Sequence, residues 1–314
     1  MKSLEIFEVG PYRNGYELGF SIGQRFSQQI KSRLSKDLIL QTQLLPFTRS
    51  PKSHSLLESL SEKNMRKYPN YWDELRGTAT GSGVPFLEIM LLNFRKEILP
   101  FIPKAESNCV NETIDDCSDI LIVSDYMAVA AHNEDANVVL VGHTYLIKGI
   151  LPNGGSFTAY TYAGELPSCA FGYNSHGLVE KSYFLQAFTL NSVPPCVHEI
   201  ESGAIGRNFI SRDLFEARNI DDALTDHDKN SLSRHKRADM LPKGSKGDVL
   251  SFLADKNDMK YPIYMTGPLL HTLCTVVIDL DEKTLSIIEG DPVKTKPHLS
   301  SQCSDSNIGG TTWY

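Results

Sequence analysis

The first third of the chain has the apolar spacing of helices. From Leu18 to Leu38 an apolar side chain recurs every four residues, which places these side chains on one stripe of a single helix. Two further helices are predicted over 71–81 and 85–98, the second opened by a proline in its first turn. A second row on the first helix consists of small residues that would let another backbone approach closely, namely Gly15, Gly19 and Gly23.

After residue 117 the pattern changes to short β-rich runs separated by turn signals. The predicted strands are 119–123, 126–131, 138–141, 157–162, 273–280 and 284–288, with helices expected over about 207–218 and 231–241. Helices followed by strands, and then by both, predict the α+β class rather than regular βαβ alternation. We expect one domain over residues 1–294 and a flexible tail over 295–314.

Composition and charge exclude several classes of protein. The 314 residues are 41% hydrophobic and 22% charged, which is typical of a globular protein. A net charge of −7 gives no general attraction to nucleic acid or to a membrane surface, so neither is expected as a partner. The N-terminus lacks a signal-peptide pattern and no run approaches the roughly 18 apolar residues of a membrane helix. A cytoplasmic location is therefore predicted, with organelle import left open.

One stretch carries candidate chemistry. Cys117 comes directly before a β-rich run, where a nucleophile could sit at the end of a strand. The polar residues 132–135 would lie on the adjacent strand of a hairpin and could face the thiol. On the residues alone, a half-buried structural cysteine beside solvated acids is the commoner explanation. No metal site is predicted, because His132, Glu134 and Asp135 are expected to alternate along one strand instead of converging.

Several separate motifs occur along the chain in an order that is more specific than any one of them. They are Gly15 with Gly19 and Gly23, Tyr68-Pro69, Glu74-Leu75-Arg76-Gly77, Gly81-Ser82-Gly83, Leu92 to Glu97, Cys117-Ser118, His132 to Asp135, Gly164 to Pro167, and Asn174 to Leu178. In these motifs nearly the whole chain resembles the acyl-coenzyme A:6-aminopenicillanic acid (isopenicillin N) acyltransferase-like family of C45 peptidase-type N-terminal nucleophile hydrolases. Among the members of this family, the sequence most resembles uncharacterised plant proteins. The resemblance implies a four-layer αββα sandwich.

The resemblance also implies a mechanism. The precursor would cut itself between Asp116 and Cys117, giving an α segment of 1–116 and a β segment that begins at 117, paired as a heterodimer. Cys117 would serve as nucleophile in self-cleavage and then in amide hydrolysis or acyl transfer through a thioester, with its new α-amino group as base. Asp135 matches the family aspartate that orients this amino group, and Asn133 lies beside it. The substrate would be a small-molecule amide or acyl donor, with acyl-coenzyme A as one candidate. No cofactor is expected, because the acyl group travels on sulfur.

Three more residues are candidates for substrate binding, and each has an ordinary alternative. Arg95 could hold the linker or an acyl carboxylate, or it could pair with an acid on its own helix. Glu165 could border an acyl pocket walled by Tyr160, Tyr162 and Phe171, although aromatic residues that alternate along a strand are more often core packing. Asn174 resembles a position close to the nucleophile in the wider hydrolase class, but asparagine before a turn glycine is ordinary turn chemistry, and we favour that role.

Two departures from the family pattern bear on activity. Asp116 stands where many members have glycine, whose conformational freedom suits a peptide bond that cleaves itself. After about residue 224 a strand segment of the family is missing, together with an asparagine that donates to the oxyanion. The alternative function is therefore a catalytically impaired splice isoform or a non-enzymatic remnant. A papain-like protease using Cys117 with a distant histidine such as His271 is a third hypothesis, although the usual sequence context is absent.

Overall fold

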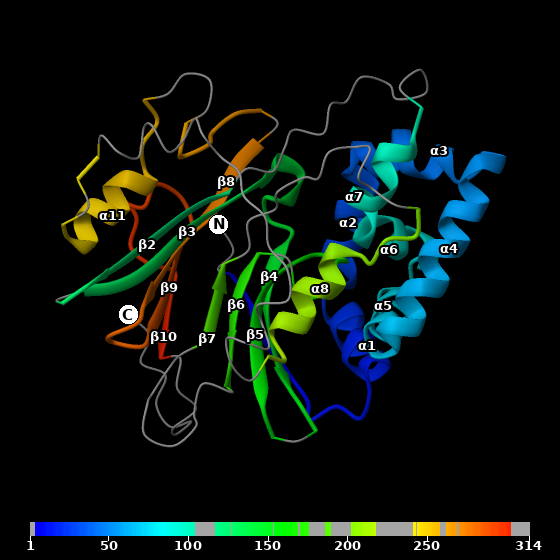
Figure 1. Ribbon diagram of the computed structural model, residues 1–314, viewed down its shortest axis with the longest axis horizontal. Helices are drawn as coiled ribbons and strands as arrows, with labels where there is room; N and C mark the ends of the chain where they lie inside the picture. The colour runs from blue at the N-terminus through cyan, green and yellow to red at the C-terminus, as the bar shows by residue number, and fades with distance from the viewer. Residues whose placement is uncertain are drawn as a thin grey trace.

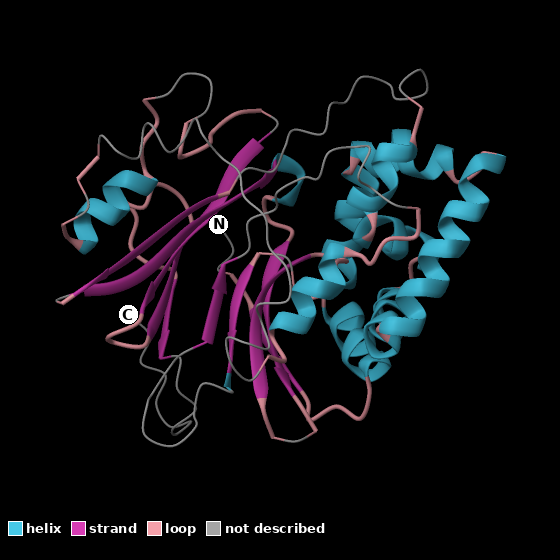
Figure 2. Ribbon diagram, in the orientation of Figure 1, coloured by secondary structure: helices cyan, strands magenta, loops and turns pink. Residues whose placement is uncertain are grey.

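The computed structural model describes residues 4–103, 117–125, 127–152, 154–168, 170–175, 186–189, 202–217, 241–242, 244–257, 262–268 and 270–302. In this part of the chain the N-terminal third is helical and most of the remainder forms two five-stranded sheets (Figures 1 and 2). The predicted α+β class is confirmed. Asp116, the segment after about residue 224 and almost all of the helix predicted over 231–241 lie outside the described residues.

The helical part follows the predicted pattern with two breaks, at Phe26 and at Phe94, so the helix predicted over 85–98 is also divided. Its elements are α1 (Gly15–Arg25), α2 (Ser27–Lys36), a π-helical turn (Leu40–Leu44), α3 (Leu45–Phe47), α4 (Pro51–Lys67), α5 (Pro69–Ser82), α6 (Phe86–Asn93), α7 (Arg95–Ile98) and a 3-10 turn (Leu99–Phe101). The single helix predicted from residue 18 to 38 is wrong in length, because Phe26 leaves helical geometry, at φ −105° and ψ 20°, and separates α1 from α2. The apolar stripe still continues through buried Ile30 and Leu34, whereas Leu38 lies past the end of α2 and is 62% exposed.

The row of glycines on α1 packs against α5, as predicted. A Cβ atom on Gly19 would lie 1.9 Å from the carbonyl oxygen of Glu74, and one on Gly77 of α5 would lie 2.1 Å from that of Tyr16. Only glycine permits this approach of two backbones. Helix α5 ends at Gly83, whose φ of +69° places it in the left-handed region that favours glycine at a helix C-terminus.

The two sheets differ in their place in the sequence. The first sheet has the order β1-β4-β5-β6-β7, with bounds Ile6–Val9, Thr144–Ile150, Ser156–Tyr162, Phe171–Asn174 and Gln186–Thr189. The second has the order β10-β9-β8-β3-β2, with bounds Leu299–Gln302, Thr284–Ile288, Leu270–Asp279, Met127–Asn137 and Ser118–Ser124. All described pairs are antiparallel except β1 with β4. The strand predicted over 138–141 is wrong, because a 3-10 turn (Val138–Leu140) precedes β4. Strand β10 lies inside the segment expected to be a tail.

Three apolar clusters hold the helices and sheets together. The first joins the N-terminal helices and α8 (Arg207–Leu214) to one face of the first sheet, through side chains such as Leu18, Phe157 and Phe209. The second lies between the two sheets and includes Tyr160 and Val276. The third joins the far face of the second sheet to α11 (Lys246–Leu253). Figure 1 shows α11 and the N-terminal helices on opposite sides of the strands. Assignment to a four-layer N-terminal nucleophile sandwich stays a prediction.

Candidate functional site

Cys117 lies immediately before β2, in the hairpin that β2 forms with β3. The register of this hairpin pairs Ser118 with Asn133 and Asp119 with His132. Because side chains alternate between the faces of a sheet, Cys117 shares a face with Asp119, His132 and Glu134. The sulfur of Cys117, a ring nitrogen of His132 and a carboxylate oxygen of Glu134 all lie within 4.8 Å of one another. We call these four residues the thiol cluster.

The thiol cluster faces the first sheet. The ring centroid of His132 lies 5.9 Å from that of Phe171 on β6. The hydroxyl of Tyr162, on β5, donates a hydrogen bond to Oε1 of Glu134. His132 itself is fully buried, with Nδ1 at 2.8 Å from Oδ1 of Asp119 and Nε2 at 2.8 Å from Oε2 of Glu134. The cluster therefore joins the facing surfaces of the two sheets.

The prediction that these polar residues do not converge is wrong. His132 and Glu134 are two apart on β3, so they share one face of the strand, and Cys117 joins them from the neighbouring strand. Only Asp135 leaves this arrangement, because it directly follows Glu134 on β3 and its side chain therefore lies on the other face of the strand. Strand pairing, which a single-strand pattern does not contain, produces the convergence.

Burial and neighbouring charges shift the pKa values of Cys117 and His132, which face each other in the thiol cluster. Burial raises the pKa of the Cys117 thiol to about 12, and the Glu134 carboxylate adds to this effect while His132 works against it. Burial works to lower the pKa of His132, but Asp119 and the hydrogen bonds around the ring raise it well above its usual value. In this arrangement the thiol is protonated and the imidazole is positively charged at neutral pH.

The other two residues of the predicted centre have different surroundings. The backbone carbonyl of Asp135 accepts a 3.8 Å hydrogen bond from the thiol of Cys117, and its carboxylate accepts one from the hydroxyl of Thr272 on β8. The side-chain amide of Asn133 donates to the backbone carbonyls of Leu253 at 2.8 Å and Ile263 at 3.0 Å. The structure thus brings Asp135 to the thiol through its backbone, and uses Asn133 to fix the end of α11 against β3.

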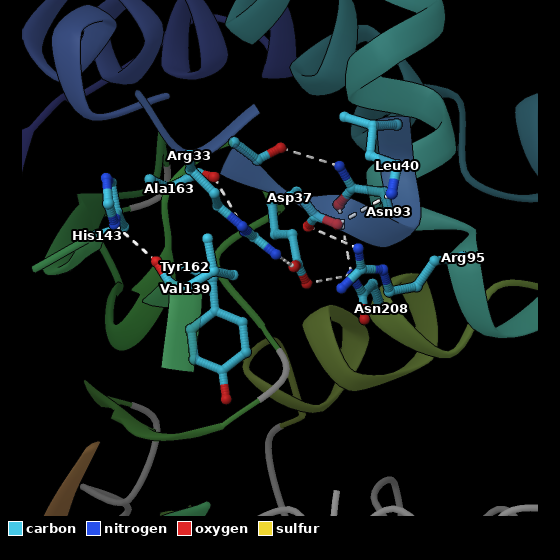
Figure 3. Close-up of polar contacts among 12 residues, drawn as sticks. Arg33, Asp37, Leu40, Asn93, Arg95, Val139, His143, Tyr162, Ala163 and Asn208 are labelled. Carbon is cyan, nitrogen blue, oxygen red and sulfur yellow. Dashed lines mark hydrogen bonds and ion pairs between the residues drawn. The ribbon is translucent and has the colours of Figure 1, made fainter. Parts of the chain in front are cut away.

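A second polar group surrounds Arg33 and Arg95, on the side of the first sheet that the helices cover (Figure 3). We call it the arginine cluster. Its members are the buried or nearly buried side chains of Arg33, Asp37, Asn93, Arg95, Glu165 and Asn208. Arg95 pairs with Asp37, which lies outside its own helix, with Nη2 2.6 Å from Oδ2. Its role toward the linker or an acyl carboxylate stays a prediction.

Glu165 lies in the middle of the arginine cluster. Its Oε1 pairs with Nη2 of Arg33, which is fully buried, and its Oε2 accepts a 3.1 Å hydrogen bond from Asn208. Burial works to raise the pKa of Glu165, but Arg33 and Arg95 lower it below its usual value. Glu165, Tyr162 and Arg95 border a polar cavity of about 20 Å³, which is room for about one water molecule.

Asn174 ties two elements of the fold together. Its side-chain amide donates to the carbonyls of Phe215 at 3.0 Å and Ala217 at 2.9 Å, just beyond α8. Asn174 therefore does more than shape the predicted turn, because its amide also holds a segment about 40 residues away along the chain.

Several residues of the two clusters escaped the sequence analysis. Pairing of 119 with 132 in the predicted hairpin could have identified Asp119. Arg33 had no local signal, because it meets Glu165 across 132 residues. Tyr162 was expected only as an aromatic wall near Glu165, and its contact with Glu134 spans 28 residues. Tyr162 also links the clusters, since the guanidinium carbon of Arg33 lies 5.8 Å from its ring centroid.

The chain is similar to a known protein family and to a characterised hydrolase. Residues 124–229, which begin just after the thiol cysteine, match the family model described as acyl-coenzyme A:6-aminopenicillanic acid acyl-transferase. The chain is 31% identical over 219 residues to the β-alanyl-dopamine/carcinine hydrolase of Drosophila melanogaster. That match covers 67% of this chain and 54% of the relative, so the chain spans about half of the relative's length. The resemblance expected from the sequence motifs is confirmed at the level of the family, and the chain is a relative of the acyl-coenzyme A:6-aminopenicillanic acid acyltransferases.

Proposed function

We propose that the protein is an amidohydrolase or acyltransferase whose nucleophile is the thiol of Cys117. The observation that carries this proposal is the position of Cys117 at the start of β2, with its sulfur beside the side chains of His132 and Glu134 between the two sheets. The family match and the hydrolase relative support the reaction class. The order of helices, two sheets and α11 supports an N-terminal nucleophile sandwich as the fold.

The proposed reaction begins with cleavage of the chain. The sulfur of Cys117 attacks the carbonyl carbon of Asp116, and the peptide C–N bond between Asp116 and Cys117 breaks. Water then hydrolyses the resulting thioester and releases the first segment. The new α-amino group then takes the thiol proton when a substrate amide or acyl donor is attacked. The substrate's leaving group departs with that proton, and the acyl group stays on sulfur as a thioester until water or an amine removes it.

Each residue around the thiol has a role in this proposal. Asp135, whose backbone oxygen already lies 3.8 Å from the sulfur, orients the new amino group. Asn133 keeps β3 fixed against α11, so it positions the hairpin rather than touching substrate. Glu165 and Arg95 hold the arginine cluster together and shape the wall next to Tyr162.

The size of the cavity beside Glu165 favours a catalytically impaired isoform as the second candidate function. The cavity beside Glu165 has room for a water molecule but not for an acyl chain. A chain that folds with this cavity closed would retain the family fold without turnover of a large acyl donor.

The intact mass of the purified chain tests the proposal, with wild type compared with Cys117→Ala. We expect wild type to give fragments of about 13 and 22 kDa, in proportion to the two segments of the 35.0 kDa chain, and the variant to stay whole. Incubation with an amide substrate should add an acyl mass to the larger fragment, and hydroxylamine should remove it. A wild-type chain that stays whole and is never acylated would favour the impaired isoform.

A further inference from the structure

We propose that the thiol cluster is a binding site for a divalent transition-metal cation, with zinc as the best fit, held by Sγ of Cys117, Nε2 of His132 and Oε2 of Glu134. The three donor atoms are of the types that Zn²⁺ combines in proteins, and they lie within 4.8 Å of one another. All three belong to one hairpin that begins at residue 117, so cleavage before Cys117 would leave the set intact.

The spacing of the donors suits a tetrahedral ion. Bonds of about 2.0–2.1 Å from zinc to nitrogen and oxygen place two such ligands about 3.3 Å apart. Nε2 of His132 and Oε2 of Glu134 lie 2.8 Å apart, at hydrogen-bond distance. A movement of about half an ångström therefore converts this hydrogen bond into two metal bonds.

The residues that hydrogen-bond to His132 and Glu134 are of the kind that supports metal ligands in proteins. Oδ1 of Asp119 lies 2.8 Å from Nδ1 of His132, which orients the ring and leaves Nε2 to bind the ion. Tyr162 donates to Oε1 of Glu134, which leaves Oε2 for the same purpose. A histidine whose second nitrogen meets a carboxylate, beside a carboxylate that is itself hydrogen-bonded, is the usual support of a zinc ligand.

The charges balance when the cation binds. The thiol proton and the proton between His132 and Glu134 are released to the solvent, and no electron changes hands. The thiolate and the carboxylate then neutralise the two positive charges of the ion, while Asp119 faces the second ring nitrogen. Sulfur and nitrogen donors select Zn²⁺ or Co²⁺ over Mg²⁺ and Ca²⁺, which prefer oxygen. Three protein ligands leave a fourth position for water or a substrate atom.

Metal binding has a consequence for the proposed function. A cation on Sγ occupies the lone pair with which the thiol would attack a carbonyl. We therefore expect Zn²⁺ to protect Cys117 from alkylation and to inhibit the reaction reversibly, an effect that rests on the function proposed above. The binding itself does not depend on that function.

Titration of the metal-free full-length protein with Co²⁺ tests the site, because a thiolate bound to cobalt gives a charge-transfer band in the near ultraviolet. We expect this band with one equivalent of Co²⁺, and its displacement by Zn²⁺. Cys117→Ser should abolish the band, and Glu134→Gln should weaken binding at least tenfold. Asp119→Asn should weaken it by about 10- to 100-fold through the histidine. Cys274→Ser, at the other free cysteine that the structure describes, should leave the band unchanged.

The outcomes separate this proposal from the proposed function. A band that survives Cys117→Ser, or cobalt that binds with no sulfur band at all, would overturn the metal site, provided that circular dichroism shows the variants to be folded. A protein that cleaves and acylates itself yet shows no Cys117-dependent band would refute only the metal site. One that binds cobalt through Cys117 and never cleaves would refute only the function.

Discussion

The hydroxyl of Tyr162, on β5 of the first sheet, donates a hydrogen bond to the Glu134 carboxylate on β3 of the second. This contact joins the two sheets at the thiol cluster. We expect Tyr162→Phe to lower the free energy of unfolding by about 1.5–3 kcal/mol, since a buried carboxylate loses a donor. The matched control is Tyr160→Phe on the same strand, whose hydroxyl meets the neutral Thr144 at 3.0 Å and should cost about 0.5–1.5 kcal/mol. Urea unfolding measures both, and equal losses would contradict a special role for the Glu134 contact.

The pair of Arg33 and Glu165 should be a strong determinant of stability. Both side chains are buried, so Glu165→Ala leaves a positive charge in the core without its carboxylate. We expect a loss of about 3–5 kcal/mol in the free energy of unfolding. The control is Asp73→Ala, which removes the exposed partner of Arg76 and should cost less than about 1 kcal/mol. Denaturant titration of the two variants checks the contrast, and a small loss for Glu165→Ala would show that water reaches Arg33.

Local sequence patterns predicted the helical part and the place of the thiol. The apolar stripe from Leu18 and the glycine row of α1 depend on spacing within one helix, which the sequence displays directly. Cys117 faces His132 and Glu134 because the two strands that carry them form a hairpin. In both cases the partners are close along the chain, so periodicity and turn signals were sufficient.

The remaining features depend on distant partners. The pairing of Arg95 with Asp37 joins residues 58 apart, and a helix pattern around Arg95 offers acids nearer in sequence. The break at Phe26 occurs within an unbroken apolar stripe, so the spacing of apolar residues gives no sign of it. The turn at 138–140 replaces a predicted strand although its valines favour β structure. A tertiary contact decided the pairing of Arg95, whereas a local cap, the Asn137 side chain that accepts from the Val139 amide, accompanies the turn.

The close packing of α1 on α5 gives a steric prediction. Gly19→Ala places a methyl group 1.9 Å from the carbonyl oxygen of Glu74, so the two helices must separate. We expect a loss of at least about 1–3 kcal/mol, the usual cost of overpacking a core. Gly247→Ala in α11 is the control, because its nearest neighbour would be the Ser245 hydroxyl at 3.6 Å, and alanine favours the helix by up to about 1 kcal/mol. Thermal unfolding compares them, and a neutral Gly19→Ala would show that the helices can move apart freely.

The carboxyl group of Glu74 gives a prediction about pH. Burial raises its pKa from the ordinary 4.5 to about 7, although Arg212, with Nε 4.0 Å from Oε2, works against the shift. The folded protein then holds this proton more tightly than the unfolded chain does. Its contribution to stability is complete below pH 4.5 and is lost as the pH rises to about 7.

The variant Glu74→Gln removes this titration and retains the shape of the side chain. We therefore expect the free energy of unfolding of wild type, relative to the variant, to fall by up to about 3 kcal/mol between pH 4.5 and 7, and then to become constant. Parallel urea titrations at several pH values measure the difference. If wild type instead gains stability relative to the variant over this range, Glu74 is ionised in the folded protein and its attraction to Arg212 outweighs the cost of burial.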